Sequence, residues 1–236
     1  MNKTVLLVGS SGGLGRAIAN ELSRKGYRLA LHYYKNKPEY VGSSDKTYCA
    51  DITREDEVRE LIAQVISDFG TIDFVINNAG ISKSEMSWKT SADSWNQTLG
   101  VNLTGPFYVA KHVLPHMREN ASGRIIFISS VVAEVGFPGT SAYAASKAGL
   151  IGLTKTLARE VAQKNITVNC IAPGYFSTGM IQDVTPEIQE QLKKQIPIGR
   201  LGDPAEIVAL IEYIFSEKSA YLTGQTIGLN GGLMMR

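Results

Sequence analysis

Short apolar runs alternate with amphipathic stretches along nearly the whole chain. The runs are rich in Val, Ile and Leu, which is typical of strands that are buried on both faces of a sheet. The stretches between them repeat apolar positions every three or four residues, as helices with one buried face do. The predicted strands are Thr4–Val8, Arg28–Tyr33, Thr47–Ala50, Phe74–Ile76, Arg124–Ile128, Ile166–Ile171 and Thr226–Leu229. The predicted helices are Arg16–Lys25, Arg54–Phe69, Ser94–Met117 with an interruption near Pro106, Tyr143–Gln163, Pro186–Gln195 and Pro204–Phe215.

This alternation predicts an α/β fold, a Rossmann-type doubly wound parallel sheet of about seven strands with helices on both faces. No linker, repeat or low-complexity tract divides the 236 residues. We therefore expect one domain over residues 1–236, with a polar, proline-punctuated insertion at about 175–200 that covers the substrate. The link from Lys35 to Asp45 is too broken for a full crossover helix. Thr53 is expected to cap the helix that follows the third strand, with Asp56 as its capping-box partner.

Charge and composition exclude several classes of function. The 24 Lys and Arg residues nearly balance the 22 Asp and Glu residues, and no basic run suggests binding to nucleic acid or to a membrane surface. No apolar window is long enough to span a membrane. His112 and His116 are four residues apart but lack the glutamate of a zinc signature, so no metal site is expected. Cys49 and Cys170 both lie in apolar runs and predict buried free thiols, which suits a cytoplasmic protein.

A glycine-rich loop separates the first predicted strand from the first helix. Gly9, Gly13 and Gly15 let the chain turn tightly, bring the backbone close to a pyrophosphate and aim the helix N-terminus at that charge. An ordinary strand-to-helix turn is the alternative interpretation. The position of the loop between a strand and a helix favours a dinucleotide site.

The end of the second predicted strand indicates which dinucleotide is bound. NAD-binding folds usually carry an acidic residue there for the ribose 2′-hydroxyl. Here the strand ends in Tyr33, with Lys35 and Lys37 nearby and no acid before Glu39. A lysine attracts a 2′-phosphate, so NADP(H) is favoured over NAD(H), although these lysines could also be ordinary solvated loop residues.

Tyr143 and Lys147 are four residues apart on a predicted helix, so their side chains share one face. An ammonium group beside a phenol favours the phenolate, and we expect Lys147 to lower the pKa of Tyr143 toward working pH. That would make Tyr143 a usable proton donor or acceptor. Alone, the pair is more often an ordinary surface Tyr and Lys.

Five motifs in a fixed order make the chain resemble the short-chain dehydrogenase/reductase family. They are the glycine loop, Asn77-Asn78-Ala79-Gly80, Ser130, Tyr143-x-x-x-Lys147 and Pro173-Gly174. Within the family the chain looks most like the β-ketoacyl-[acyl-carrier-protein] reductases and acetoacetyl-CoA reductases. The supporting text is Gly123-Arg124-Ile125-Ile126, the run from Tyr143 to Gly152, and Gly224-Gln225-Thr226.

The resemblance implies a role for each matching residue. Tyr143 would be the general acid, Ser130 would hydrogen-bond the substrate carbonyl, and Lys147 would hold the nicotinamide ribose. Asn102 would hold a water molecule in a proton relay. The cofactor-binding residues expected from the loop and the resemblance together are Gly9, Ser11, Gly13, Leu14, Gly15, Tyr33, Lys35, Asp51, Ile52, Asn78, Ala79, Gly80, Tyr143, Lys147, Pro173, Gly174 and Thr178.

The sequence also departs from the family pattern. Val8 stands where Thr is common, Gly12 replaces a frequent Arg that helps bind the 2′-phosphate, and Ala121 lies where related reductases often carry Arg. Lys164 and Arg118 are candidates for a basic patch that would suit an acidic acyl carrier protein near the mouth of the site.

The implied function is NADP(H)-dependent reduction of a ketone, most plausibly a 3-oxoacyl thioester of acyl carrier protein or CoA in fatty acid biosynthesis. An alcohol, sugar or polyketide dehydrogenase would use the same residues. A non-catalytic dinucleotide-binding regulator is the alternative of another class. The resemblance further implies a homotetramer.

Overall fold

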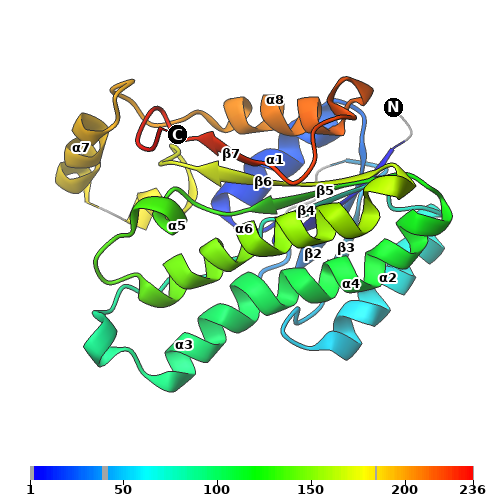
Figure 1. Cartoon of the computed structure of the whole chain (residues 1–236), viewed down its shortest axis with the longest axis horizontal. Coiled ribbons are helices and arrows are strands. Elements are labelled where there is room, and N and C mark those ends of the chain that lie inside the picture. The colour runs from blue at the N-terminus through cyan, green and yellow to red at the C-terminus, as the bar shows by residue number, and fades with distance from the viewer. Residues whose placement is uncertain (1–2, 39–41, 184, 236) are drawn as a thin grey trace.

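A computed structural model describes residues 3–38, 42–183 and 185–235 and confirms the predicted fold class. Its seven strands form one parallel sheet in the order β3-β2-β1-β4-β5-β6-β7 (Figure 1). The strands are β1 (Thr4–Val8), β2 (Arg28–Tyr33), β3 (Lys46–Cys49), β4 (Phe74–Asn77), β5 (Gly123–Ile128), β6 (Ile166–Pro173) and β7 (Thr226–Leu229). The α-helices are α1 (Gly13–Arg24), α2 (Glu55–Phe69), α3 (Ala92–Leu99), α4 (Gly105–Glu119), α5 (Val132–Val135), α6 (Ser141–Val161), α7 (Pro186–Gln195) and α8 (Pro204–Phe215).

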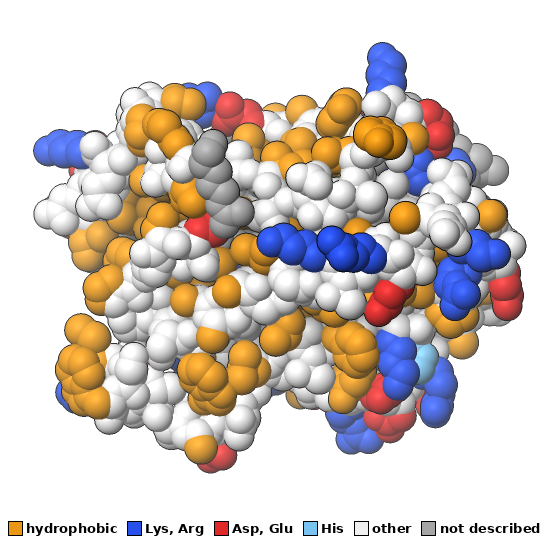
Figure 2. Space-filling model, in the orientation of Figure 1, with side chains coloured by type: hydrophobic (Ala, Val, Ile, Leu, Met, Phe, Trp, Pro, Cys, Tyr) orange, Lys and Arg blue, Asp and Glu red, His pale blue; other side chains and the backbone are white. Residues whose placement is uncertain are grey.

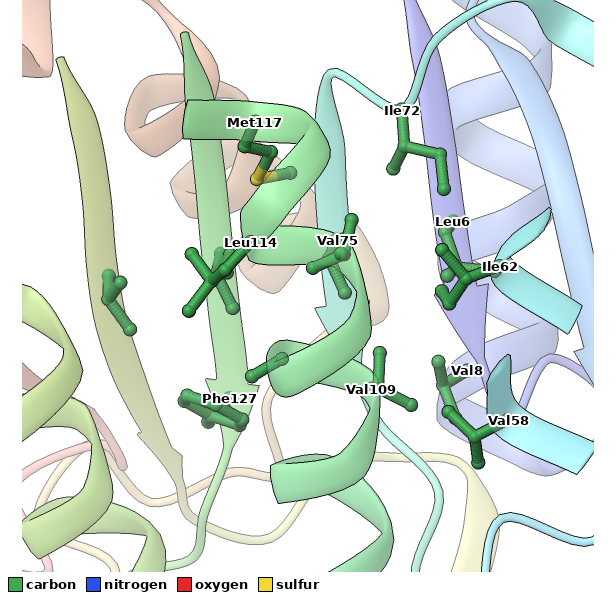
Figure 3. Packing of buried hydrophobic residues seen from close by; sticks show 14 of the residues in the cluster. Leu6, Val8, Val58, Ile62, Ile72, Val75, Val109, Leu114, Met117 and Phe127 are labelled. Atoms are coloured by element: carbon green, nitrogen blue, oxygen red, sulfur yellow. The ribbon is translucent and has the colours of Figure 1, made fainter. Parts of the chain in front are cut away.

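Each face of the sheet has its own apolar core. Helices α2, α4 and α6 cover one face, where Ile62 of α2 packs near Leu6 of β1 and Leu114 of α4 lies over β5 (Figure 3). Helices α1 and α8 cover the other face, where Phe215 stacks on Phe74 with ring centroids 4.1 Å apart. Because both faces are covered, the strands are continuously apolar rather than alternating.

The parallel register brings the ends of four strands to one edge. Val8 of β1 pairs with His32 of β2 and with Asn77 of β4, and Asn77 pairs with Phe127 of β5. All strands run the same way, so the loops that follow β1, β4, β5 and β6 meet along the carboxyl edge of the sheet. In an open α/β sheet this edge is where ligands bind.

Several local predictions need correction. Helix α1 begins at Gly13 rather than Arg16, because the last two glycines of the loop already belong to its first turn. Thr53 does not cap α2; its hydroxyl donates to Asp51, and Arg54 occupies the cap position with no side-chain capping hydrogen bond. The predicted 94–117 helix is α3 and α4 joined by a π-helical turn at Gly100–Thr104, with Pro106 in the first turn of α4.

The link between β2 and β3 agrees with one prediction, but Cys49, which follows it, does not agree with another. The described parts of the link between β2 and β3, residues 34–38 and 42–45, contain no helix, as predicted. One consequence was not foreseen: Cys49 is exposed, whereas Cys170 is buried as expected. Both thiols are free. Across the described ranges, no helix combines the length and apolarity that a bilayer requires.

Candidate active site

A cavity of about 1220 Å³ lies along the carboxyl edge of the sheet. Every residue predicted to bind a cofactor lines it, together with Ser130. Asn102 does not line the cavity. The structure therefore brings together residues that lie up to 169 positions apart in the sequence, from Gly9 to Thr178.

The glycine loop leaves no room for side chains on its inner face. Gly9 has φ +82°, and a Cβ there would lie 2.5 Å from the Cα of Ala79. A Cβ on Gly15 would meet the Gly9 carbonyl oxygen, and one on Gly13 would meet the backbone of Gly179. Asn78 fixes the turn from the other side, since its Nδ2 donates to the Gly9 carbonyl at 2.8 Å.

The first turn of α1 is suited to an anion. Its cap residue is Gly12, which has no side chain to bond to the free N–H groups of the first turn. A Cβ built on Gly12 would meet nothing within 4 Å, so the space beside it is open. The N-terminal N–H groups of the helix border the cavity and carry the positive end of the helix dipole. A pyrophosphate is the group that such a cradle fits best.

Tyr143 and Lys147 share one face of α6, as their spacing predicts. The Lys147 Nζ lies 5.7 Å from the centre of the Tyr143 ring and donates to the Ile128 carbonyl, at the end of β5, at 2.8 Å. Ser130 follows the same strand, and its hydroxyl accepts from the Val132 N–H at 3.2 Å. The two hydroxyls of Ser130 and Tyr143 form a side-chain hydrogen bond.

Burial sets the protonation of both groups. It lowers the pKa of Lys147 to about 8, because the ammonium is removed from water. Burial also raises the pKa of Tyr143, while the hydrogen bond with Ser130 lowers it. The expected lowering of the Tyr143 pKa by Lys147 is wrong for the protein alone: the loss of hydration outweighs the other influences. At neutral pH Tyr143 therefore holds its proton and can donate it.

Comparison with known protein families gives a match to the family described as "Enoyl-(Acyl carrier protein) reductase" over residues 8–234. The match spans the glycine loop, the Tyr143 helix and the final strand. The chain belongs to the short-chain dehydrogenase/reductase family. Members of this family are dinucleotide-dependent oxidoreductases, and the cavity has the features that such a cofactor requires.

Individual relatives match over their full length. The chain is 40% identical to the 3-oxoacyl-[acyl-carrier-protein] reductase FabG of Staphylococcus epidermidis, covering all of both chains. It is 36% identical to FabG of Vibrio cholerae, covering 99% of this chain and 98% of the relative. It is 40% identical to the acetoacetyl-CoA reductase of Shinella zoogloeoides, covering 98% of each.

Asn102 lies beneath the site of this short-chain dehydrogenase/reductase, in the π-helical turn, and is fully buried. Its Oδ1 accepts from the Ile81 N–H at 2.8 Å, and its Nδ2 donates to the Ile81 carbonyl at 2.9 Å and to Ser146 Oγ at 3.1 Å. Asn102 thus holds the chain directly after Gly80. The water-relay role stays a prediction.

The basic residues expected near the mouth lie elsewhere. Arg118 is in the last turn of α4, and Lys164 ends the short 3-10 turn after α6, two residues before β6. Helices α4 and α6 run antiparallel to the strands, so their C-terminal ends lie at the amino edge of the sheet, opposite the cavity. Lys35 lines the cavity, whereas Lys37 borders a separate hollow beside β3. Glu39 is outside the described residues.

Two kinds of lining residue were missed from the sequence. His32, at the end of β2, faces the cavity and carried no motif. An apolar wall is formed by Phe137 before α6 and by Ile181, Ile188 and Leu192 of the 175–200 insertion. Apolar residues in a polar, proline-rich segment are the signal that could have identified this wall.

Replacing Gly9 by Ala is expected to lower the free energy of unfolding by more than about 1 kcal/mol, because the side chain would be strained and would overlap Ala79. Urea denaturation monitored by circular dichroism measures this change. Gly152→Ala is the matched control: Gly152 lies within α6 with open space around it, so the same substitution should be neutral or stabilising. Equal midpoints for the two variants would contradict the close approach of loop and Ala79.

Proposed function

We propose that this protein is an NADP(H)-dependent reductase that converts a 3-oxoacyl thioester, carried by CoA or acyl carrier protein, to the 3-hydroxyacyl form. The observation that carries the proposal is the placement of Ser130, Tyr143 and Lys147 around one cavity that also contains the glycine loop. The names of the full-length relatives support the thioester. The proposal treats the whole chain as one catalytic domain that acts in the cytoplasm, where free thiols persist.

Ser130 and Tyr143 have different roles in the proposed reaction. When bound, the nicotinamide cofactor would supply a hydride to the ketone carbon, and negative charge would develop on the ketone oxygen. The hydroxyls of Ser130 and Tyr143 are positioned to donate hydrogen bonds to that oxygen. Tyr143, whose pKa is raised by burial, then donates its proton to the oxygen as general acid.

Lys147 serves both cofactor and acid. One of its ammonium protons goes to the Ile128 carbonyl, which fixes the side chain in the cavity wall. Two protons remain for the hydroxyls of the nicotinamide ribose. As a cation beside Tyr143, Lys147 also stabilises the phenolate that remains after proton transfer. Tyr143 can act again as the acid only after it is reprotonated, for which Asn102 and a bound water are the proposed route.

The cofactor choice follows from the rim of the cavity beyond β2. Tyr33 and Lys35 line this end, and the Lys35 Nζ lies 5.5 Å from the centre of the Tyr34 ring. Among the described residues from Tyr34 to Pro38 there is no carboxylate to repel a 2′-phosphate. A cation held over an aromatic ring at the ribose end supports NADP(H).

The apolar wall of Phe137, Ile181, Ile188 and Leu192 suits an acyl chain rather than a sugar. The description of the family match names a different reaction, reduction of an enoyl thioester. We favour the ketone because two hydroxyls converge where a developing alkoxide needs donors. Acetoacetyl-CoA and crotonyl-CoA have acyl groups of the same length, so they separate the two reactions.

Tyr143→Phe should reduce the turnover of acetoacetyl-CoA with NADPH by about 10²-fold or more, since the proton donor is lost. Its NADPH affinity should remain within about twofold of the original protein. Stopped-flow oxidation of NADPH and fluorescence titration measure the two quantities. Retained turnover would assign the proton to another group. If the original protein turns over crotonyl-CoA but not acetoacetyl-CoA, its reaction is enoyl reduction and not ketone reduction. If it binds NADPH tightly but turns over neither substrate, a non-catalytic regulator is favoured.

Lys35→Glu should weaken NADPH binding by about tenfold or more while leaving NADH binding nearly unchanged, because the new carboxylate repels only the 2′-phosphate. The ratio of the two dissociation constants is the measurement. Lys37→Glu makes the same charge change outside the cavity and should alter this ratio much less. If Lys37→Glu has the larger effect, the 2′-phosphate is recognised from the other side of the loop.

A homotetramer is the proposed assembly. Large apolar side chains are exposed around α3 and α4, with Trp88 at 79% and Phe107 at 40% exposure, and hydrophobic groups gather on this face in Figure 2. Such an apolar surface is characteristic of an interface. Sedimentation equilibrium at micromolar concentration should give four times the chain mass of 25.6 kDa. A monomer under these conditions would contradict the assembly.

A further inference from the structure

His32 makes contacts on both sides of the dinucleotide site although no motif identifies it. The residue is the second last of β2 and is 2% exposed. Its Nδ1 lies 3.2 Å from the Gly9 nitrogen in the glycine loop, and its Nε2 lies 3.0 Å from the Ala50 carbonyl oxygen after β3. Its own carbonyl accepts from both the N–H and the hydroxyl of Ser10, each at 2.9 Å.

The partners determine the tautomer. A backbone N–H can only donate, so Nδ1 must accept from Gly9. A carbonyl oxygen can only accept, so Nε2 must carry the proton that is donated to Ala50. The bridge therefore requires a neutral imidazole with its proton on Nε2. A second proton on Nδ1 would face the Gly9 N–H, donor against donor.

The two connected segments hold opposite parts of the proposed cofactor. Gly9 begins the loop for the pyrophosphate, and Ala50 directly precedes Asp51 and Ile52, which line the same cavity and which the family resemblance places beside the adenine. We propose that His32 is a positioning residue for the dinucleotide, whose neutral imidazole holds the glycine loop in register with the Ala50–Ile52 segment. This inference rests on the proposed function, because it presupposes that the cavity binds a dinucleotide.

The surroundings of the imidazole support this role. Burial lowers the pKa of His32, although the Ala50 carbonyl and the charge of Asp51 both act to raise it. Glu57 of α2 faces Asp51 by accepting its N–H. On β3, Tyr48 is the pairing neighbour of His32, but its hydroxyl is turned to Asp68. The neighbours of His32 on the other side are Val8 at the end of β1 and Gly9 after it, and neither has a titratable side chain.

Acidification should weaken the bridge made by His32. The folded pKa of His32 is lower than the ordinary value of about 6.5, so the folded protein favours the neutral ring. The stabilisation is complete above pH 6.5 and is lost as the pH falls below it, through the lowered folded pKa. Because the cofactor adds contacts to the same loop, its affinity should fall in that acidic range.

Three variants test the proposal. In His32→Asn, the amide oxygen takes the place of Nδ1 as acceptor for Gly9 and does not titrate. In His32→Leu, both hydrogen bonds are lost. His116→Asn is the matched control, because His116 contacts Thr71 and Ile72 at the amino edge of the sheet. Dissociation constants for NADPH and NADH are measured by fluorescence titration between pH 5.5 and 8, with folding checked by circular dichroism.

The original protein and His116→Asn should lose NADPH affinity between pH 7.5 and 5.5, by less than about tenfold because the folded pKa of His32 lies below its ordinary value. His32→Asn should bind nearly as tightly at pH 7.5 but lose clearly less on acidification. His32→Leu should bind about tenfold more weakly already at pH 7.5. Titration of the NADPH 2′-phosphate is common to all four proteins and is absent with NADH, so it does not affect the comparison.

Identical pH profiles for His32→Asn and the original protein would overturn the positioning role. The same holds if His32→Asn only lowers the thermal midpoint while its affinities match at every pH, because that result describes a structural residue. If His32→Leu does not fold, the Asn variant decides. Failure of the original protein to bind either dinucleotide at any pH would instead overturn the proposed function itself.

Discussion

The buried ammonium of Lys147 is the constraint on which the rest of the site depends. The Lys147 side chain is only 3% exposed, and this burial lowers the pKa of its ammonium group to about 8. Relative to an exposed lysine, the shift corresponds to roughly 3 kcal/mol in favour of the neutral amine. The folded pKa is below the unfolded one, so this group destabilises the charged fold near pH 7, and the penalty disappears as the pH rises from 8 toward 10.5. Among the described residues, the hydrogen-bond partner of this ammonium is the Ile128 carbonyl oxygen. A ligand rich in hydroxyls, such as a ribose, would relieve the penalty. The site is therefore organised for its ligand rather than for stability alone.

Close backbone packing connects the two halves of the cavity. The Gly13 and Gly179 backbones are in contact, so the first turn of α1 touches the segment that continues into Ile181. That segment carries part of the apolar wall. Any cofactor at the helix N-terminus would thus sit against the chain that shapes the acyl pocket. This arrangement gives a physical basis for coupling between cofactor binding and the substrate-facing insertion, because Gly13 cannot take a side chain without moving the Gly179 backbone.

The sequence predicted what depends on local pattern. The seven strands and the shared face of Tyr143 and Lys147 follow from periodicity and appear in the structure, whereas the predicted Ser94–Met117 helix is two helices and α5 was not predicted. Properties set by tertiary surroundings were predicted poorly. The Tyr143 pKa moved opposite to expectation because hydration is lost on burial, which residue spacing does not reveal. Arg118 and Lys164 were assigned to the wrong edge because helix direction relative to the sheet was not considered. The roles of the catalytic residues rest on the family resemblance.

The short link after β2 lies at the end of the cavity that Lys35 lines. The described parts of this link, residues 34–38 and 42–45, contain no helix, and the thiol of the exposed Cys49 at the end of β3 donates to the Tyr34 carbonyl at 3.2 Å. Asp45 takes over part of the missing support, accepting from Ser23 on α1 and from the Leu29 N–H. The ends of β1, β2 and β3 must then be held together by contacts between the strands themselves. His32 provides such a contact from inside the sheet. With no helix in the described parts of the link, the site depends more strongly on the internal bridge through His32.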